Sequence, residues 1–340
     1  MSKEPLNQNV SVGAELTETG LNVNAKSRLV TAIDRFCGNL FEFGNIPMER
    51  RHAKGRAEIE LDQTKRDGER QLVEAMTRAA IKRIKTDPAF AERAIENYLG
   101  KMAVQQENKD QVVRNAVEDL RRDPTANEAG ELDPAFLDRF ERHAEEASIE
   151  ALREKWGRVL AAEIRDPGSI TPRVMRIVDE IEASTAELFE EFCLSRLANF
   201  VPVCLHGRLK APDVAALVGA DLLVEPGVGG QVCYSAKISD DQGKEVSFLT
   251  FGRNGVGWRT ELPAATLRKG DGPLQAHDNG PAVPVYVLTN AGFAVSKILP
   301  KTESDAFGRY VAALRAFAPD VTFEQYVAVG DDRWGVVANA

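Results

Sequence analysis

The 340-residue sequence has few of the features that mark secreted, membrane-spanning or metal-stabilised proteins. Its four cysteines, Cys37, Cys193, Cys204 and Cys233, lie far apart and form no Cys-x-x-Cys pair, which argues against a disulfide framework and a structural zinc site. No apolar run reaches the roughly 18 residues of a membrane-spanning helix, and the polar N-terminal stretch lacks the apolar segment of a secretory signal. We therefore expect a cytoplasmic protein with reduced thiols.

Motifs for nucleotide binding and nucleophilic catalysis are also missing. The run Pro-Gly-Val-Gly-Gly at residues 226–230 precedes Gln231, whereas a phosphate-binding loop needs Lys followed by Ser or Thr. We interpret this run as a hairpin turn, because proline and glycine favour turns. No Gly-x-Ser-x-Gly elbow occurs, and only four histidines are present for acid–base chemistry. The sequence therefore predicts no catalytic residue and no cofactor.

Two histidines have neighbours that could bind a metal. Cys204 lies two residues from His206, and His143 lies one helical turn from Glu146. Tetrahedral zinc needs three or four protein ligands, and a di-iron bundle needs a second Glu-x-x-His motif with two further glutamates. Because neither set is present, we predict no metal site and interpret His143 as a solvated helix residue.

Acidic residues outnumber basic ones, 52 Asp and Glu against 43 Lys and Arg, and the net charge is −9. Residues 49–85 depart from this balance, with 11 Lys and Arg against 7 Asp and Glu. That segment predicts a long solvated helix whose narrow apolar seam meets a partner helix. Because acidic residues flank its basic ones and the whole chain is acidic, we do not expect nucleic-acid binding.

The N-terminal part combines a polar tail with an amphipathic segment. Residues 1–24 predict a disordered tail, and residues 25–86 predict the amphipathic helix followed by the charged helix. The apolar stripe needs a cover, which is either the chain's own bundle, a second subunit or protein partner, or a membrane surface contacted peripherally. The candidate assembly or membrane-facing residues are Leu29, Ile33, Phe36, Leu40 and Phe41.

Residues 87–200 predict a helical bundle with short loops. Three helix starts combine an N-cap side chain with a following proline, which already has helical φ. A fourth start at Ser184 has Glu187 three residues later, as in a capping box. We expect the first long helix to be broken near Gly100. The three capping residues before proline are Asp87, Asp133 and Thr171.

Residues 201–340 predict an α+β domain with antiparallel strands. A short helix near residues 212–223 precedes segments of β-type composition at residues 231–238, 244–251 and 281–289. Asn254-Gly255 is typical of a hairpin turn. Two helices and a final strand pair follow. The whole chain is therefore expected to be mainly helical α+β, with N-terminal amphipathic and charged helices, a central bundle and this C-terminal region.

One block of the bundle carries a recognisable pattern. It reads Leu-x-x-x-Trp-x-x-x-Leu-Ala-x-Glu-Ile, then Pro-Gly-Ser, with a Leu-Thr-x-x-Gly element further on. This pattern resembles a bacterial family of unknown function. It is more distantly similar to phage abortive-infection proteins of the Abi-alpha type, which share the tryptophan helix and the Leu-Thr-x-x-Gly element. The residues that carry the pattern, and that we expect in the core, are Trp156, Leu160, Pro167, Gly168 and Gly292.

The resemblance implies a function but supplies no catalytic residue. Our hypothesis is a non-enzymatic interaction protein, acting in prokaryotic phage defence or stress through oligomerisation or a protein partner. The alternative is a ligand- or nucleotide-sensing domain, or an enzyme, that uses residues 201–340. A ligand that binds only the native state raises apparent stability, and this effect distinguishes the two interpretations.

Overall fold

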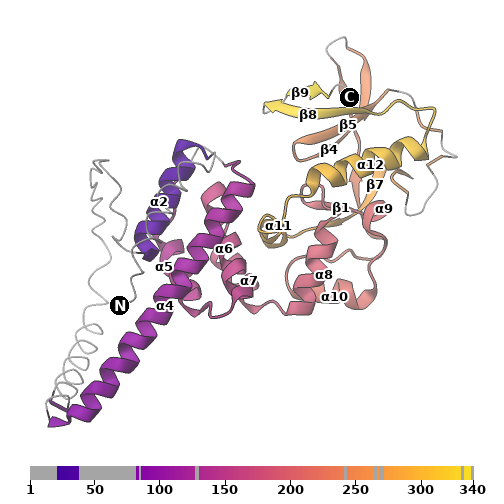
Figure 1. Ribbon diagram of the computed structural model, residues 1–340. Helices are drawn as coiled ribbons and strands as arrows, with labels where there is room; N and C mark the ends of the chain where they lie inside the picture. Colours follow the sequence, from indigo (N-terminus) through magenta and orange to yellow (C-terminus); the bar gives the residue numbers. More distant parts are fainter. Residues whose placement is uncertain are drawn as a thin grey trace, which may run out of the picture. The chain divides into compact units, whose positions relative to one another are not determined.

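The computed structural model describes residues 21–37, 82–83, 86–126, 130–240, 243–259, 261–263, 266–267, 272–330 and 333–337. The chain divides into two compact units, Met1–Pro167 and Gly168–Ala340 (Figure 1). Most of the predicted tail and charged helix lies outside the described residues. Of the predicted tail, residues 21–24 are described: Leu21 is buried and the first helix already begins at Val23.

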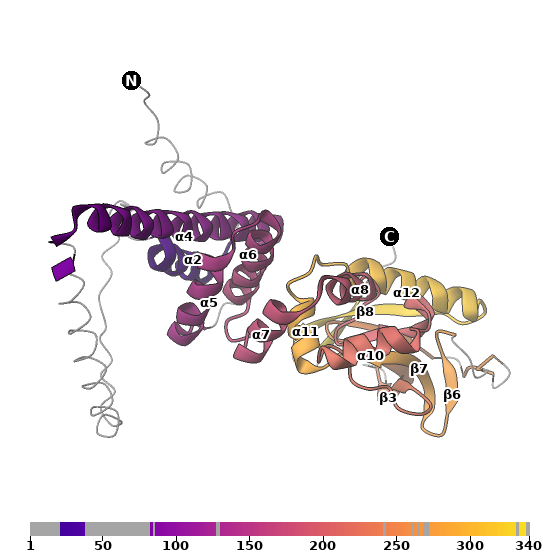
Figure 2. The same ribbon diagram turned by 90° about the horizontal axis from the view of Figure 1, so that it is seen from below.

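The first unit is a helical bundle built along one long helix. The described helices are α2 (Val23–Cys37), α4 (Pro88–Arg122), α5 (Pro134–Glu146) and α6 (Glu150–Arg165). Helices α2, α5 and α6 all contact α4. Figures 1 and 2 show them along its C-terminal part, while the first turns of α4 extend beyond them.

Helix starts in this unit follow the predicted chemistry. The Asp87 side chain accepts a hydrogen bond from the Phe90 amide, and the Asp133 side chain accepts one from the Ala135 amide. Each side chain satisfies an amide that has no partner within the helix. The predicted break near Gly100 is wrong, because α4 continues through it without interruption.

The second unit combines helices with two antiparallel sheets. Strand β7 (Gly280–Val287) pairs with β1 (Phe200–Pro202), β2 (Gln231–Tyr234) and β6 (Gln275–His277). The other sheet has the order β3-β4-β5-β8-β9, formed by Ala236–Ser239, Glu245–Phe251, Asn254–Trp258, Glu324–Gly330 and Arg333–Val336. The helices are α7 (Pro172–Glu180), α8 (Ala183–Cys193), α9 (Val203–His206), α10 (Ala211–Gly219), α11 (Asn290–Ser296) and α12 (Glu303–Phe317).

Helix α12 packs with both sheets in one hydrophobic core. Tyr310 of α12 is buried against Phe251 of β4, with ring centroids 5.3 Å apart, and Val283 and Val285 of β7 belong to the same cluster. The Tyr310 hydroxyl donates to the Pro273 carbonyl oxygen at 3.1 Å, so its burial leaves no unpaired donor. The mainly helical α+β fold is thus confirmed.

The structure divides the chain after Pro167, so the predicted boundary near residue 200 lies inside the second unit. Helix α7 contacts α11, and α8 contacts α10, so these two helices belong with the second unit. The Thr171 side chain caps α7, as predicted, by accepting from the Val174 amide. The capping box at Ser184 is wrong, because the N-cap position of α8 is Glu182, two residues earlier, and no side chain caps the helix.

Two strand predictions also need correction. The segment 231–238 divides at Ser235, whose amide and hydroxyl both donate to the Pro281 carbonyl, so its two halves enter different sheets. The hairpin between β4 and β5 is closed by the pair Phe251 and Asn254, which makes Gly252 the first turn residue, at φ +61°. Gly255 lies within β5, where an added Cβ would come 2.6 Å from the Phe248 ring.

Candidate functional site

The first half of α4 presents large apolar side chains to solvent. We call residues 88–104 the arm. Along it, Ile95, Tyr98, Leu99 and Met102 are 48–66% exposed. Together with Ala91 they follow helical spacing of three and four residues, which places them on one face. We call these five residues the arm stripe.

The arm stripe continues a face that is buried further along the same helix. Steps of three and four residues lead from Met102 through Gln105 and Lys109 to Val112 and Ala116, and the last two are fully buried. The residue spacing is therefore the same along the whole face, which is apolar at the arm stripe and again at Val112 and Ala116. What differs is that α2, α5 and α6 cover only the C-terminal half.

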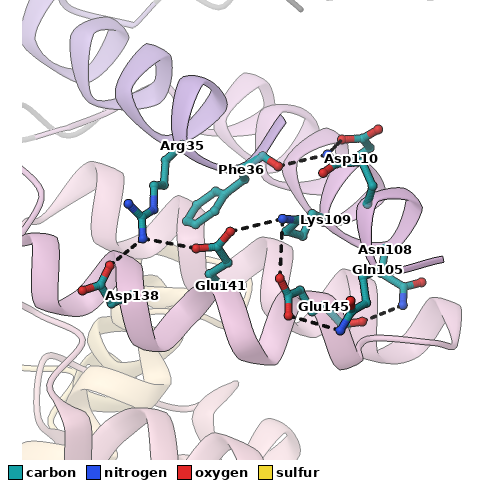
Figure 3. Close-up of polar contacts among 10 residues, drawn as sticks. Arg35, Phe36, Gln105, Asn108, Lys109, Asp110, Asp138, Glu141 and Glu145 are labelled. Carbon is teal, nitrogen blue, oxygen red and sulfur yellow. Dashed lines mark hydrogen bonds and ion pairs between the residues drawn. The ribbon is translucent and has the colours of Figure 1, made fainter. Parts of the chain in front are cut away.

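A belt of polar contacts marks where this cover begins (Figure 3). Gln105 Nε2 donates to Glu145 of α5 at 3.3 Å, and Gln106 Nε2 donates to the Phe36 carbonyl oxygen of α2 at 3.0 Å. Lys109, whose side chain is 12% exposed, lies 3.1 Å from Glu141 and 3.6 Å from Glu145. The cover by α2 and α5 therefore begins directly after Met102, the last residue of the arm stripe.

The same belt holds α2 in place. Arg35 of α2 contacts Asp138 at 2.6 Å and Glu141 at 3.3 Å, both on α5. Glu141 therefore lies between Arg35 and Lys109, as Figure 3 shows, and links three helices. The Arg35 pair is half-exposed and contributes little to stability, whereas the partly buried Lys109 contacts are screened less by salt.

The predicted assembly residues of α2 belong to the core of the first unit. Leu29, Ile33 and Phe36 are 0–1% exposed, and Phe36 packs on Phe140 of α5 with ring centroids 5.3 Å apart. Helices of the same chain cover these three residues, so the chain's own bundle, one of the three covers left open by the sequence, applies to them. The other two candidates, Leu40 and Phe41, lie outside the described residues.

The pattern residues of α6 serve folding. Trp156 and Leu160 are buried as expected, and His143 stacks on Trp156 at 4.3 Å, so it is a packing residue and not a solvated one. Pro167 is half-buried. Gly168 is an exposed turn residue at φ +84°, so its assignment to the core was wrong.

Gly292 of the Leu-Thr-x-x-Gly element allows a close approach between two backbone segments. A Cβ at this position would lie within 3 Å of the Leu222 backbone. The Thr289 side chain accepts from the Gly292 amide at 2.8 Å and donates to the Asp221 carbonyl oxygen. The element thus caps α11 and fastens it to the segment after α10.

A groove of about 950 Å³ separates α10 from the four-stranded sheet. Val214 and Val218 of α10 line one side, and Val232, Pro284 and Tyr286 line the other. Although α10 is strongly apolar, only Leu217 is fully buried. Arg208, Glu225 and Gln275 add polar groups at the lining.

The glycine-rich run forms one wall of this groove, and its assignment to a hairpin is corrected. The Val224 amide donates to the Val287 carbonyl oxygen, and Gln231 pairs with Val285. The segment between Val224 and Gln231 is therefore a loop that leaves one edge of β7 and rejoins that same edge. The Gln231 side chain accepts from the Val287 amide at 3.1 Å. Gly227, Gly229 and Gly230 all have positive φ, which favours glycine.

The thiols and His206 have the properties of packing residues. Burial raises the pKa of all four cysteine thiols, to about 12 for Cys193 and Cys204, so they stay protonated at neutral pH. Desolvation lowers the pKa of His206, against the opposing effect of Glu191 and Asp213. Within the described ranges, no three His, Cys, Asp or Glu side chains are arranged to hold a metal.

Sequence reasoning missed both the arm stripe and the groove. The apolar spacing in residues 91–102 is visible in the sequence, but it equals that of the buried half of α4. The groove is formed by residues far apart in the chain, from Val203 to Tyr286. No local pattern indicates such a gap, because it results from how a helix and a sheet are placed.

Comparison with known proteins gives one partial match. Residues 92–199 match the family model described as protein of unknown function, DUF2806. The matched segment begins within the arm and ends just before β1. No curated protein and no solved structure matches the chain.

Among the helices that the structure describes, none combines the length and apolar character required to cross a bilayer.

Proposed function

We propose that this protein is a non-enzymatic interaction protein that assembles with copies of itself through the arm stripe. The observation that carries the proposal is the exposure of Ile95, Tyr98, Leu99 and Met102 on one face of a projecting helix. Contiguous exposed apolar patches are typical of interaction sites, whereas single exposed apolar residues are ordinary.

The charge of the arm supports a second copy as the partner. The whole chain carries −9, which opposes self-association. In residues 88–104, however, Glu92 and Glu96 are balanced by Arg93 and Lys101. Two arms can therefore approach without net repulsion, although two complete chains repel.

Energetic considerations predict a reversible assembly. Burying the half-exposed stripe side chains of two arms contributes on the order of 10 kcal/mol, since a fully buried side chain of this kind contributes about 1.5–3 kcal/mol. Association costs about 4–15 kcal/mol in lost freedom. Because the two quantities are similar, we expect a dimer whose population depends on protein concentration.

Solution mass tests this function. Light scattering after size exclusion compares the full chain with the double variant Tyr98→Asp/Met102→Asp. The matched control is Val104→Asp, because Val104 is also 58% exposed but lies on the opposite face of α4. We expect multimers for the wild type and the control, and a monomer for the stripe variant. A wild type that stays monomeric at all concentrations would contradict the proposal.

We further propose that this assembly serves prokaryotic phage defence or a stress response. The proposal is supported by the resemblance of the Trp156 helix and the Leu-Thr-x-x-Gly element to abortive-infection proteins. Expression of the chain should lower phage plating on a broad panel. The stripe variant should lose this protection while Val104→Asp keeps it. Equal plating with and without the chain would count against the defence role.

The groove under α10 favours a second candidate function, the binding of a mostly apolar small molecule. Its volume of about 950 Å³ and its Val and Pro walls fit the usual dimensions and lining of ligand sites. A thermal-shift screen with nucleotides, metals and apolar compounds tests this alternative. A concentration-dependent rise that Val218→Arg abolishes would support it, whereas a flat response to all compounds would not.

A further inference from the structure

We infer that α4 pairs in antiparallel orientation with α4 of a second copy, with Ile95 of one chain opposite Tyr98 of the other. This inference rests on the proposed self-assembly and specifies its geometry. It follows from three observations: where the bundle begins, the order of residue sizes along the stripe, and the position of Lys101.

The first observation is steric. Gln105 and Gln106 bond to α5 and α2, so the bundle begins at this level and on the face that carries the stripe. In a parallel, in-register pair, both bundles would begin at the same level between the two helices and would occupy the same space. In an antiparallel pair, each bundle lies beyond the tip of the other arm.

The second observation is the match of side-chain sizes. When Pro88 at the tip of one arm reaches Gln105 of the second copy, the stripe positions meet in successive layers. Ala91 then lies opposite Met102, and Ile95 lies opposite Tyr98. Each layer combines a smaller with a larger side chain, which favours interdigitation. The overlap spans about 18 residues, or roughly 27 Å at 1.5 Å per residue.

The third observation excludes the neighbouring antiparallel register. A pair centred on Gly100 would place Lys101 beside Lys101 of the second copy, and like charges that flank a helical seam repel. It would also bring Ala91 against Lys109, which is held by Glu141 and Glu145 in the polar belt. The register centred between Glu96 and Asn97 avoids both conflicts.

Disulfide cross-linking in the full chain tests this geometry. Ala91→Cys and Met102→Cys are prepared separately, mixed, equilibrated and oxidised by air with a copper–phenanthroline catalyst. We expect a covalent dimer from the mixture and almost none from either variant alone. Val104→Cys, on the opposite face, is the control and should give none. The native thiols should react little, because burial raises their pKa.

The outcomes separate this inference from the function on which it rests. Covalent dimers from each variant alone, with no gain on mixing, would show parallel helices and overturn the inference while self-assembly stands. A dimer in light scattering without any cross-link would place the interface elsewhere and overturn both. A chain that is monomeric in light scattering, with no cross-link, would show that the stripe is covered by its own chain or by another protein.

Discussion

Buried charged residues link the helices of the first unit. Glu163 of the α6 pattern is 1% exposed, and Arg28 of α2 is buried near it. Arg28 Nη1 donates to the Gly130 carbonyl oxygen at 3.0 Å. Desolvation lowers the Arg28 pKa, while the charges of Asp166 and Glu163 act in the opposite direction. Asp166 and the glutamate of the pattern therefore both compensate the buried arginine.

Replacing this glutamate should destabilise the first unit. Glu163→Gln leaves the buried Arg28 with less compensating charge, and we expect the free energy of unfolding to fall by about 1–3 kcal/mol. Urea unfolding followed by circular dichroism measures the loss. The control is Glu118→Gln, whose side chain is 53% exposed and lies 3.8 Å from Arg122; it should change stability by less than about 1 kcal/mol. Equal effects of the two variants would contradict this role.

His206 makes the stability of the second unit depend on pH. Its ring packs edge-on against Phe192 at 5.0 Å, and desolvation holds its pKa below the ordinary value of 6.5. The folded state therefore favours the neutral ring, and stability falls as the pH drops below about 6.5 towards the lowered pKa. His206→Phe keeps the ring but does not titrate. Its melting temperature should fall less than that of the wild type between pH 8 and pH 5; identical changes would refute the prediction.

At the scale of elements, two glycines in helices have opposite roles. A Cβ at Gly157 of α6 would lie 2.6 Å from Cβ of Asn115, so α4 and α6 pack closely there. A Cβ at Gly100 of α4 would meet nothing within 4 Å. The first glycine is required by packing, whereas the second only weakens the arm.

Alanine substitutions should therefore change stability in opposite directions. Gly157→Ala forces the helices apart and should cost about 1–3 kcal/mol. Gly100→Ala should stabilise α4 by up to about 1 kcal/mol, because alanine is the better helix former. Chemical unfolding of both variants measures the difference. Since Gly100 lies away from the stripe, its variant should keep the wild-type oligomeric state. Destabilisation by Gly100→Ala would reveal a contact at that position.

At the scale of the whole molecule, each of the two units has a core of its own. The core of the second unit consists of α12 and residues of both sheets, including Trp258 and Tyr310. It needs no side chain from the first unit, because every member of this cluster follows Pro167. A separate core of this kind is typical of a domain that folds on its own.

Residues 168–340 expressed alone should therefore unfold cooperatively on heating. The measurement is near-ultraviolet circular dichroism together with the tryptophan emission of the fragment. Tyr310→Ala in the same fragment removes the central ring and should cost about 3–5 kcal/mol, as for other large buried aromatics. A fragment without a cooperative transition would show that the second unit depends on the first.

The sequence by itself determined the three helix starts that precede a proline, the presence of antiparallel C-terminal strands and the overall α+β class. Those features depend on local chemistry, such as the Asp87 cap and the alternation of apolar residues in 244–251. It also predicted α2 as an amphipathic helix whose stripe needs a cover.

Tertiary structure alone decided which surfaces are buried. Spacing and composition do not distinguish Leu29 of α2 from Leu99 of the arm, because both lie on apolar stripes, yet the first is buried and the second exposed. The unit boundary at Pro167 and the groove under α10 depend on contacts between distant residues. The physical reason is that burial is a property of neighbours in space, whereas periodicity records only which side of an element is apolar.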